Sequence, residues 1–95
     1  MKLVVSRDAV ADINRLRAFL ADKNPAAALR AVTTIVAAIQ SLDMSSDRGR
    51  PTGTVGVREL IVPFGRSAYV LRYSHLQDAD EVLILRIWHG REQRD

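Results

Sequence analysis

The hydrophobic positions in the first half of the chain repeat at helical spacing. A short apolar run at residues 2–5 predicts a strand. Beyond it, two stripes recur every three or four residues, which is typical of amphipathic helices. The first stripe is Val10, Ile13, Leu16 and Leu20; the second is Leu29, Val32, Val36 and Ile39, widened by Ile35 and Leu42. We therefore expect an antiparallel helical hairpin over residues 7–43.

Capping signals set the ends of these helices. Ser6 is a suitable N-cap, and Asp8 in the first turn favours the helix dipole. Asn24 followed by Pro25 ends the first helix and begins the second, as an N-cap with proline at the first helical position. Residues 44–55 contain Ser, Asp, Pro and Gly turn signals, which predict a loop.

The second half of the chain predicts three strands. They cover residues 57–62, 67–74 and 81–88, with turns at Pro63–Gly65 and at Gln77–Asp80. Residues 82–85 are apolar throughout, so the last strand is expected to be central and covered on both faces. The predicted order β-α-α-β-β-β is an α+β fold in which a helical hairpin packs on a small, mostly antiparallel sheet.

Length and composition exclude several classes of protein. The chain has 95 residues, which suits one domain over 1–95. With 47% hydrophobic and 26% charged residues it is expected to fold, and no apolar run is long enough to span a bilayer. Cysteine is absent, which excludes disulfides and thiolate sites and fits a reducing cytosol. We expect a cytoplasmic protein without a membrane partner.

The basic residues are almost all arginine. Twelve of the 14 basic residues are Arg, and the formal net charge is +3. Between residues 48 and 76 five Arg stand against one acid, Glu59. The planar, permanently charged guanidinium suits phosphates and carboxylates. This excess therefore suggests an anionic partner, although an Arg bias also arises from genome composition.

Three of these arginines form a row if the predicted turns are symmetrical. A turn about Ala79 places Arg72 opposite Arg86, and a turn about Gly65 places Arg58 opposite Arg72. Like charges directly opposed on a sheet are destabilising, so such a row would indicate a bound phosphate or partner carboxylate. The alternative is separate surface arginines, some of them paired with Glu59 or Glu81. A shift of one residue in the strand pairing moves a strand's side chains to the other face, so the register decides between a row of arginines and separate arginines.

Histidine and glutamate offer limited acid–base chemistry. An unperturbed imidazole titrates near neutrality, so His89 is either a general acid or base or a structural residue bonded to a backbone carbonyl. Glu59 is either a base beside Arg58 or part of a structural pair, and His75 is expected to be solvated. Trp88 is expected to pack in the core or an interface. No residue spacing indicates a metal site or a cofactor.

Four sequence segments resemble toxins of the ParE/RelE superfamily from bacterial type II toxin–antitoxin systems. They are Gly49-Arg50-Pro51, Gly56-Val57-Arg58-Glu59-Leu60, Tyr69-Val70-Leu71-Arg72-Tyr73 and Ile84-Leu85-Arg86-Ile87-Trp88-His89-Gly90-Arg91. The resemblance implies the fold predicted above and an antitoxin that wraps the toxin. It also implies one of two activities: RelE-like members cut mRNA on the ribosome, whereas ParE-like members poison DNA gyrase.

The residues favour the ParE-like reading. RelE-like nucleases tend to carry an Arg a few residues before a Tyr in the third strand, where this chain has Val70 before Tyr73, and no Lys follows Lys23. We therefore expect a growth-inhibiting toxin of the plasmid-stabilisation type, neutralised by a cognate antitoxin and reaching operator DNA only through it. The residues expected to bind antitoxin or target are Arg58, Arg72, Arg86, Trp88 and Arg91.

Two alternatives remain open at this point. The first is a ribosome-dependent mRNA endonuclease in which Arg58, Arg72 and Arg86 stabilise the phosphate and His89 transfers a proton. The second is a weakly toxic member of the fold whose main role is to partner an antitoxin in an autorepressing complex on DNA.

Overall fold

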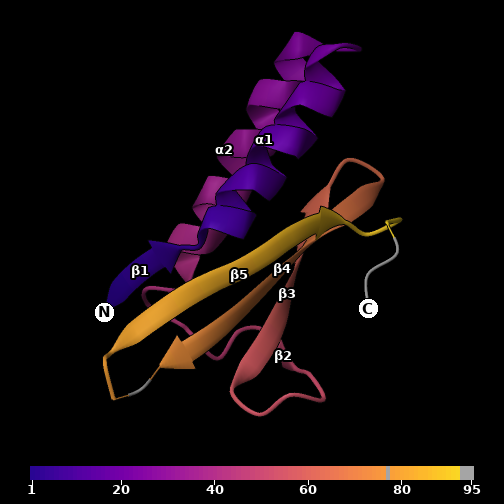
Figure 1. Cartoon of the computed structure of the whole chain (residues 1–95). Helices are drawn as coiled ribbons and strands as arrows, with labels where there is room; N and C mark the ends of the chain where they lie inside the picture. The colour runs from indigo at the N-terminus through magenta and orange to yellow at the C-terminus, as the bar shows by residue number, and fades with distance from the viewer. Residues whose placement is uncertain (77, 93–95) are drawn as a thin grey trace.

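Two helices pack against one face of a five-stranded sheet (Figure 1). The structure is a computed structural model that describes residues 1–76 and 78–92. The elements are β1 (Lys2–Val5), α1 (Arg7–Ala21), α2 (Pro25–Ser41), β2 (Arg50–Pro51), β3 (Val57–Phe64), β4 (Ser67–Leu76) and β5 (Glu81–His89). The strand order is β1-β5-β4-β3-β2; β1 runs parallel to β5 and the other pairs are antiparallel. This confirms the predicted α+β fold.

The predicted helix boundaries are confirmed. The Ser6 side chain accepts the amide of Ala9 at 3.0 Å, and the Asn24 side chain accepts the amide of Ala27 at 3.1 Å, ahead of Pro25. These caps satisfy amide groups that have no partner inside a helix. No helix within the described ranges is long and apolar enough to cross a membrane.

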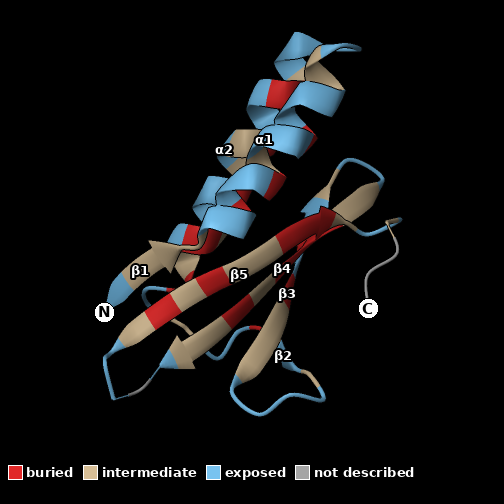
Figure 2. Cartoon of the chain, viewed as in Figure 1, coloured by how far each residue is buried: buried red, intermediate tan, exposed pale blue. Residues whose placement is uncertain are grey.

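The predicted apolar stripes are rotated from those observed. In α2 the buried residues are Ala28, Ala31, Ile35 and Ile39, while Leu29 is 69% exposed. In α1 Ala9 is fully buried and Val10 is 45% exposed. Figure 2 shows the buried positions on the helix sides that meet each other and the sheet. Small alanines at the contact allow close approach, so the seam contains alanines beside Ile35 and Ile39 in place of Leu29 and Val36.

The centre of the β3–β4 turn lies between Gly65 and Arg66, half a residue later in the sequence than predicted. Phe64 pairs with Ser67, which leaves Gly65 and Arg66 as a two-residue loop. Gly65 has a φ of +60°, as the first central residue of a type II′ turn requires. The register therefore places Glu59, not Arg58, opposite Arg72. The predicted row of three arginines is wrong.

The β4–β5 hairpin matches the prediction at Arg72 and then departs from it. Arg72 pairs with Arg86, but the next pair is Tyr73 with Ile84, so β5 carries one extra residue. This β-bulge re-phases the strand. As a result Val82, Ile84 and Ile87 are all buried in the core under the helices, although their spacing changes from two to three.

Two other predictions on the sheet need correction. The loop over residues 44–55 contains the short strand β2, whose Arg50 and Pro51 pair with Glu59 and Arg58. A two-residue strand with proline leaves no periodicity to detect. The last strand is not covered on both faces, because both helices lie on one face and Leu83 and Leu85 are only partly buried. Gln77, in the second predicted turn, lies outside the described residues.

Candidate partner-binding surface

A buried carboxylate joins α1 to the bulged end of β5. Asp12, 3% exposed, accepts the Nε and Nη2 hydrogens of Arg86 at 2.8 and 3.0 Å, and also the backbone amide of Ile87 at 2.8 Å. Burial by itself raises the pKa of Asp12, but the Arg86 and Ile87 hydrogen bonds and the charges of Arg86 and Arg15 outweigh it, so the pKa is lowered. The same pairing raises the pKa of Arg86. Asp12 is therefore ionised at neutral pH.

This carboxylate completes the open edge of β5. β1 pairs with β5 only as far as Ile84, and beyond it the chain continues as α1. The side chains of Ser6 and Asp12 then take over, bonding the carbonyl of Leu85 and the amide of Ile87. Unpaired backbone groups on a strand edge invite association with other chains. Here the N-cap Ser6 and the α1 residue Asp12 satisfy two of them.

Arg72 is neutralised on the sheet itself. Its Nε and Nη2 hydrogens are both donated to Glu59 Oε2, at 3.0 and 2.9 Å, and Arg50 Nη2 lies 3.8 Å from Glu59 Oε1. The Arg72 guanidinium also lies over the Trp88 ring, 4.8 Å from its centroid. Trp88 is 6% exposed, as its expected packing role requires. Glu59 is thus a structural partner for arginines across the strands.

His89 closes a groove between α1 and the sheet. The groove has a volume of about 640 Å³ and apolar walls formed by Leu16, Phe19, Leu20, Phe64 and Tyr69. His89 packs edge-on against Tyr69. Its Nδ1 accepts the Arg91 amide at 3.2 Å, whereas the structural alternative had this histidine bonded to a backbone carbonyl. Burial, helped by the charge of Glu92, raises the pKa of Tyr69 and keeps its phenol neutral.

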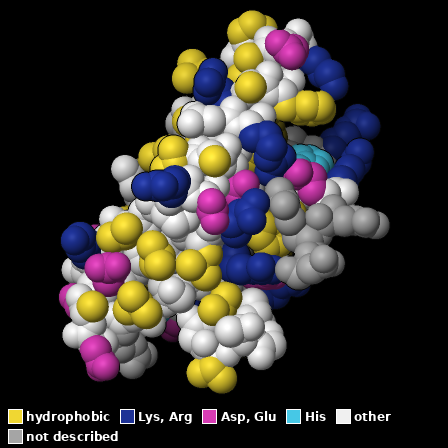
Figure 3. Space-filling view, viewed as in Figure 1, with side chains coloured by type: hydrophobic (Ala, Val, Ile, Leu, Met, Phe, Trp, Pro, Cys, Tyr) yellow, Lys and Arg dark blue, Asp and Glu magenta, His cyan; other side chains and the backbone are white. Residues whose placement is uncertain are grey.

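The rim of this groove is charged. Glu92 accepts the His89 amide at 2.7 Å and Arg15 Nη1 at 2.7 Å, which ties the end of β5 to α1. Arg91 is exposed at the rim, and Phe19 on the wall is 61% exposed. Figure 3 shows basic side chains, interleaved with acidic ones, on the side of the molecule where β5 ends. A mixed rim around apolar walls suits a protein partner.

Arg58 lies elsewhere. It pairs with Tyr73, four residues along β4 from the Tyr69–His89 pair, which is about 13 Å at strand spacing. Side-chain alternation puts Arg58 on the helix face and Arg72 on the other. Arg58 Nη1 donates to the Gly49 carbonyl at 2.7 Å. The sheet therefore brings Arg72 together with Arg86 and Trp88. His89 and Arg91 lie at the groove, three residues further along the strands, and Arg58 faces the helices beside Tyr73.

A tyrosine anchors the loop beside Arg58. The Tyr73 hydroxyl donates to the Ser46 carbonyl at 2.6 Å and accepts the Gly49 amide at 2.9 Å. A Cβ at Gly49 would lie 2.7 Å from the Tyr73 Oη, so only glycine fits there. His75, expected to be solvated, is half-buried, and its Nδ1 is 3.1 Å from Ser46 Oγ. In the part of the chain that the structure describes, no cluster of three or more His, Asp or Glu residues is arranged to hold a metal ion.

Comparison with known proteins decides the family. Residues 3–94 match the family described as the ParE toxin of the type II toxin–antitoxin system parDE. The chain belongs to this ParE toxin family. It is a type II toxin–antitoxin toxin, as its sequence segments suggested.

Individual ParE and RelE relatives cover nearly the whole chain. Toxin RelE1 of Caulobacter vibrioides is 45% identical over 92 residues, which is 97% of this chain and 96% of the relative. Toxin RelE3 of the same organism is 41% identical over 83 residues, 87% of each chain. A solved structure titled as the chromosomal ParDE TA system from P. aeruginosa matches with a TM-score of 0.80 and 29% identity, over 94% of this chain and 95% of that one.

The sequence reasoning missed Asp12 in this ParE-family chain. It stands on α1 between Val10 and Ile13, where an amphipathic pattern indicates a solvated position. An acid inside an apolar stripe is the one signal that could have found it. The role of Glu59 was left open, because its partner depends on a register that the turn alone determines.

Proposed function

We propose that this toxin inhibits bacterial growth in the cytoplasm by binding DNA gyrase, and that a cognate antitoxin neutralises it. The observation that supports a binding mechanism is the separation of the residues a nuclease would need. Arg58 is on one face of the sheet and about 13 Å along the strand from His89, and Arg72 is on the other face. A proton-transfer group and the cations that stabilise its transition state must converge on one phosphate.

The arginines suit an interface better than a catalytic centre. Arg72 and Arg86 each use two N–H groups on an internal carboxylate, which fixes their side chains. A guanidinium has five N–H donors, so the others remain for a partner. Arg72 and Arg86 are 29% and 38% exposed, and Arg91 stands beside an apolar groove. Rigid, partly exposed arginines near apolar walls are typical of protein-binding residues.

The names of two relatives favour a second candidate, an mRNA endonuclease. Toxins RelE1 and RelE3 of Caulobacter vibrioides bear the RelE name at 45% and 41% identity. In that case His89 would transfer the proton, and Arg58, Arg72 and Arg86 would stabilise the phosphate. A third possibility, weak toxicity with a mainly antitoxin-partnering role, predicts no growth arrest.

Induction of the toxin without its antitoxin separates these functions. We expect growth arrest with DNA damage, an intact message pool and co-purification of gyrase. His89→Ala should retain toxicity, whereas loss of a catalytic acid or base would reduce the rate by about 10²–10⁴-fold. Rapid mRNA cleavage that disappears in His89→Ala would favour the endonuclease instead, provided that the variant still binds antitoxin.

A further inference from the structure

Arg58 carries a charge that no internal carboxylate balances. Three of the described arginines are partly buried: Arg58, Arg72 and Arg86. Arg72 binds Glu59 and Arg86 binds Asp12, but Arg58 makes one hydrogen bond, to the Gly49 carbonyl, and no described carboxylate lies within ion-pair distance of it. Partial burial of an unpaired cation is unfavourable, and an external anion would relieve it.

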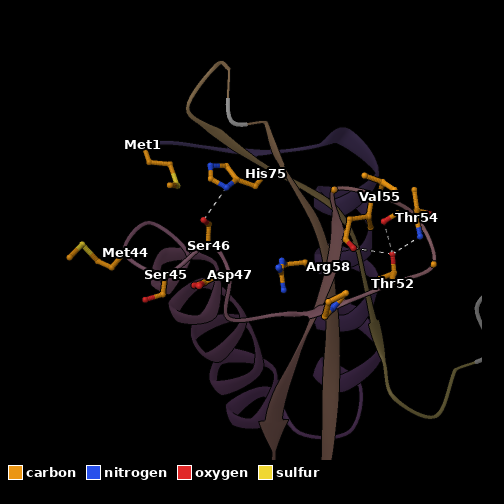
Figure 4. Close-up of a pocket in the computed structure, with 14 residues that line it drawn as sticks. Met1, Met44, Ser45, Ser46, Asp47, Thr52, Thr54, Val55, Arg58 and His75 are labelled. Carbon is orange, nitrogen blue, oxygen red and sulfur yellow. Dashed lines mark hydrogen bonds between the residues drawn. The ribbon is translucent and has the colours of Figure 1, made fainter.

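This guanidinium faces a polar cavity of about 690 Å³. Figure 4 shows Arg58 reaching from β3 toward Ser46 and Asp47 on the loop that follows α2, with His75 of β4 above the same loop. The hydroxyls of Ser45, Ser46 and Thr52 also line the cavity. Asp47 is the acid in this lining, and it is exposed.

We propose that this cavity binds the phosphate group of a nucleotide-sized small molecule, with Arg58 as its anchor. A guanidinium offers a fork that matches phosphate oxygens, and the Ser45 hydroxyl in the same lining can bond a tetrahedral group from another direction. The Thr52 hydroxyl is held by Val57 and Thr54, and Ser46 is bonded to His75. The volume falls within the range of small-molecule sites, roughly 300–1,000 Å³. The proposal goes beyond gyrase binding and does not depend on it, because it rests on the unpaired charge of Arg58.

Calorimetric titration of the purified full-length chain at low salt tests this site. The probes are adenosine 5′-monophosphate, inorganic phosphate and adenosine. We expect the monophosphate to bind, inorganic phosphate to bind more weakly and adenosine not to bind. Arg58→Gln should weaken the monophosphate by about tenfold or more, since a hydrogen-bonded charge is lost, whereas Arg58→Lys should lose less. Asp47→Asn should tighten binding severalfold, because it removes the repelling carboxylate.

Arg66→Gln is the matched control. It removes the same charge from the exposed β3–β4 turn, at the far end of β3 from Arg58, and it should leave the affinity unchanged within about twofold. Thermal unfolding checks that Arg58→Gln is folded; if it is not, Asp47→Asn decides by its gain in affinity. The proposal would be overturned by no binding at millimolar monophosphate, by equal binding of adenosine, or by equal losses in Arg58→Gln and Arg66→Gln. Binding of a tri-glutamate peptide in place of the monophosphate would instead indicate a carboxylate site, and would overturn it too.

Discussion

Arg72 on β4 lies directly opposite Arg86 on β5, and the two guanidinium groups bind carboxylates on different elements. Arg72 turns to Glu59 on β3, and Arg86 turns to Asp12 on α1. Two like charges at facing positions would normally destabilise a sheet. Here each guanidinium forms an ion pair with its own carboxylate, so the repulsion between the two arginines is reduced. The β-bulge lies next to Arg86 on β5.

Replacing Asp12 should destabilise the fold. Asp12→Ala leaves the Arg86 charge and the Ile87 amide without their partner, so we expect a loss of about 2–4 kcal/mol in the free energy of unfolding. Asp12→Asn keeps an acceptor for the amide and should cost less. Urea unfolding measures both. Asp8→Asn, at an exposed first-turn position, is the control, and an equal loss there would refute the specific role of Asp12.

The Asp12 carboxylate should make the free energy of unfolding depend on pH in the acidic range. The folded state lowers the pKa of Asp12 below its ordinary value of 3.8, so the unfolded chain takes up the proton first. The contribution of Asp12 is therefore complete above that value and is lost as the pH falls through the lower folded pKa. Urea midpoints measured from about pH 6 to pH 3 should converge for wild type and Asp12→Asn. A constant difference between them would contradict this linkage.

Gly49→Ala should loosen the loop before β2. Its Cβ would meet the Tyr73 hydroxyl at 2.7 Å, so the bonds from Tyr73 to Gly49 and Ser46 must lengthen or break. We expect a loss of roughly 1–3 kcal/mol, typical of overpacking. Gly53→Ala is the matched control, because a Cβ there meets open space. Thermal unfolding of the two variants should separate them; equal melting temperatures would show that the loop adjusts freely.

Arg91→Gln should slow association with the antitoxin. Arg91 is exposed at the rim of the groove, where charge steers encounter more than it deepens affinity. We expect the association rate to fall by a factor of roughly two to five at low salt, with little change in dissociation. Surface plasmon resonance measures both rates. Arg30→Gln, exposed on α2, removes an equal charge away from the groove, and an equal slowing would indicate only net-charge attraction.

Local sequence signals predicted the helices and strands well. The strand register and the buried contacts depend on residues far apart in the sequence and could not be predicted in the same way. Ser6, Asn24 and Pro25 mark helix ends because capping is a contact between near neighbours. The position of Arg58 depended on whether the hairpin loop has two residues or an odd number, which changes the partner of every residue in β3. Asp12 bonds Ile87 on the bulged strand across 75 residues of sequence. The acid inside an apolar stripe is therefore the one local sign of its burial, and no local pattern indicates the bulge.

The pairing of β1 with β5 also bears on synthesis of the toxin. Lys2 lies beside Glu81 and Val5 beside Ile84, so β1 cannot pair until β5 has been synthesised. Until β5 emerges, α1 lacks the strand that Asp12 binds, and β1 stays unpaired. Contacts of such long sequence separation form late in folding. Appearance of the folded toxin is thus tied to translation through β5, and a chain cut short before β5 lacks the strand that pairs with β1.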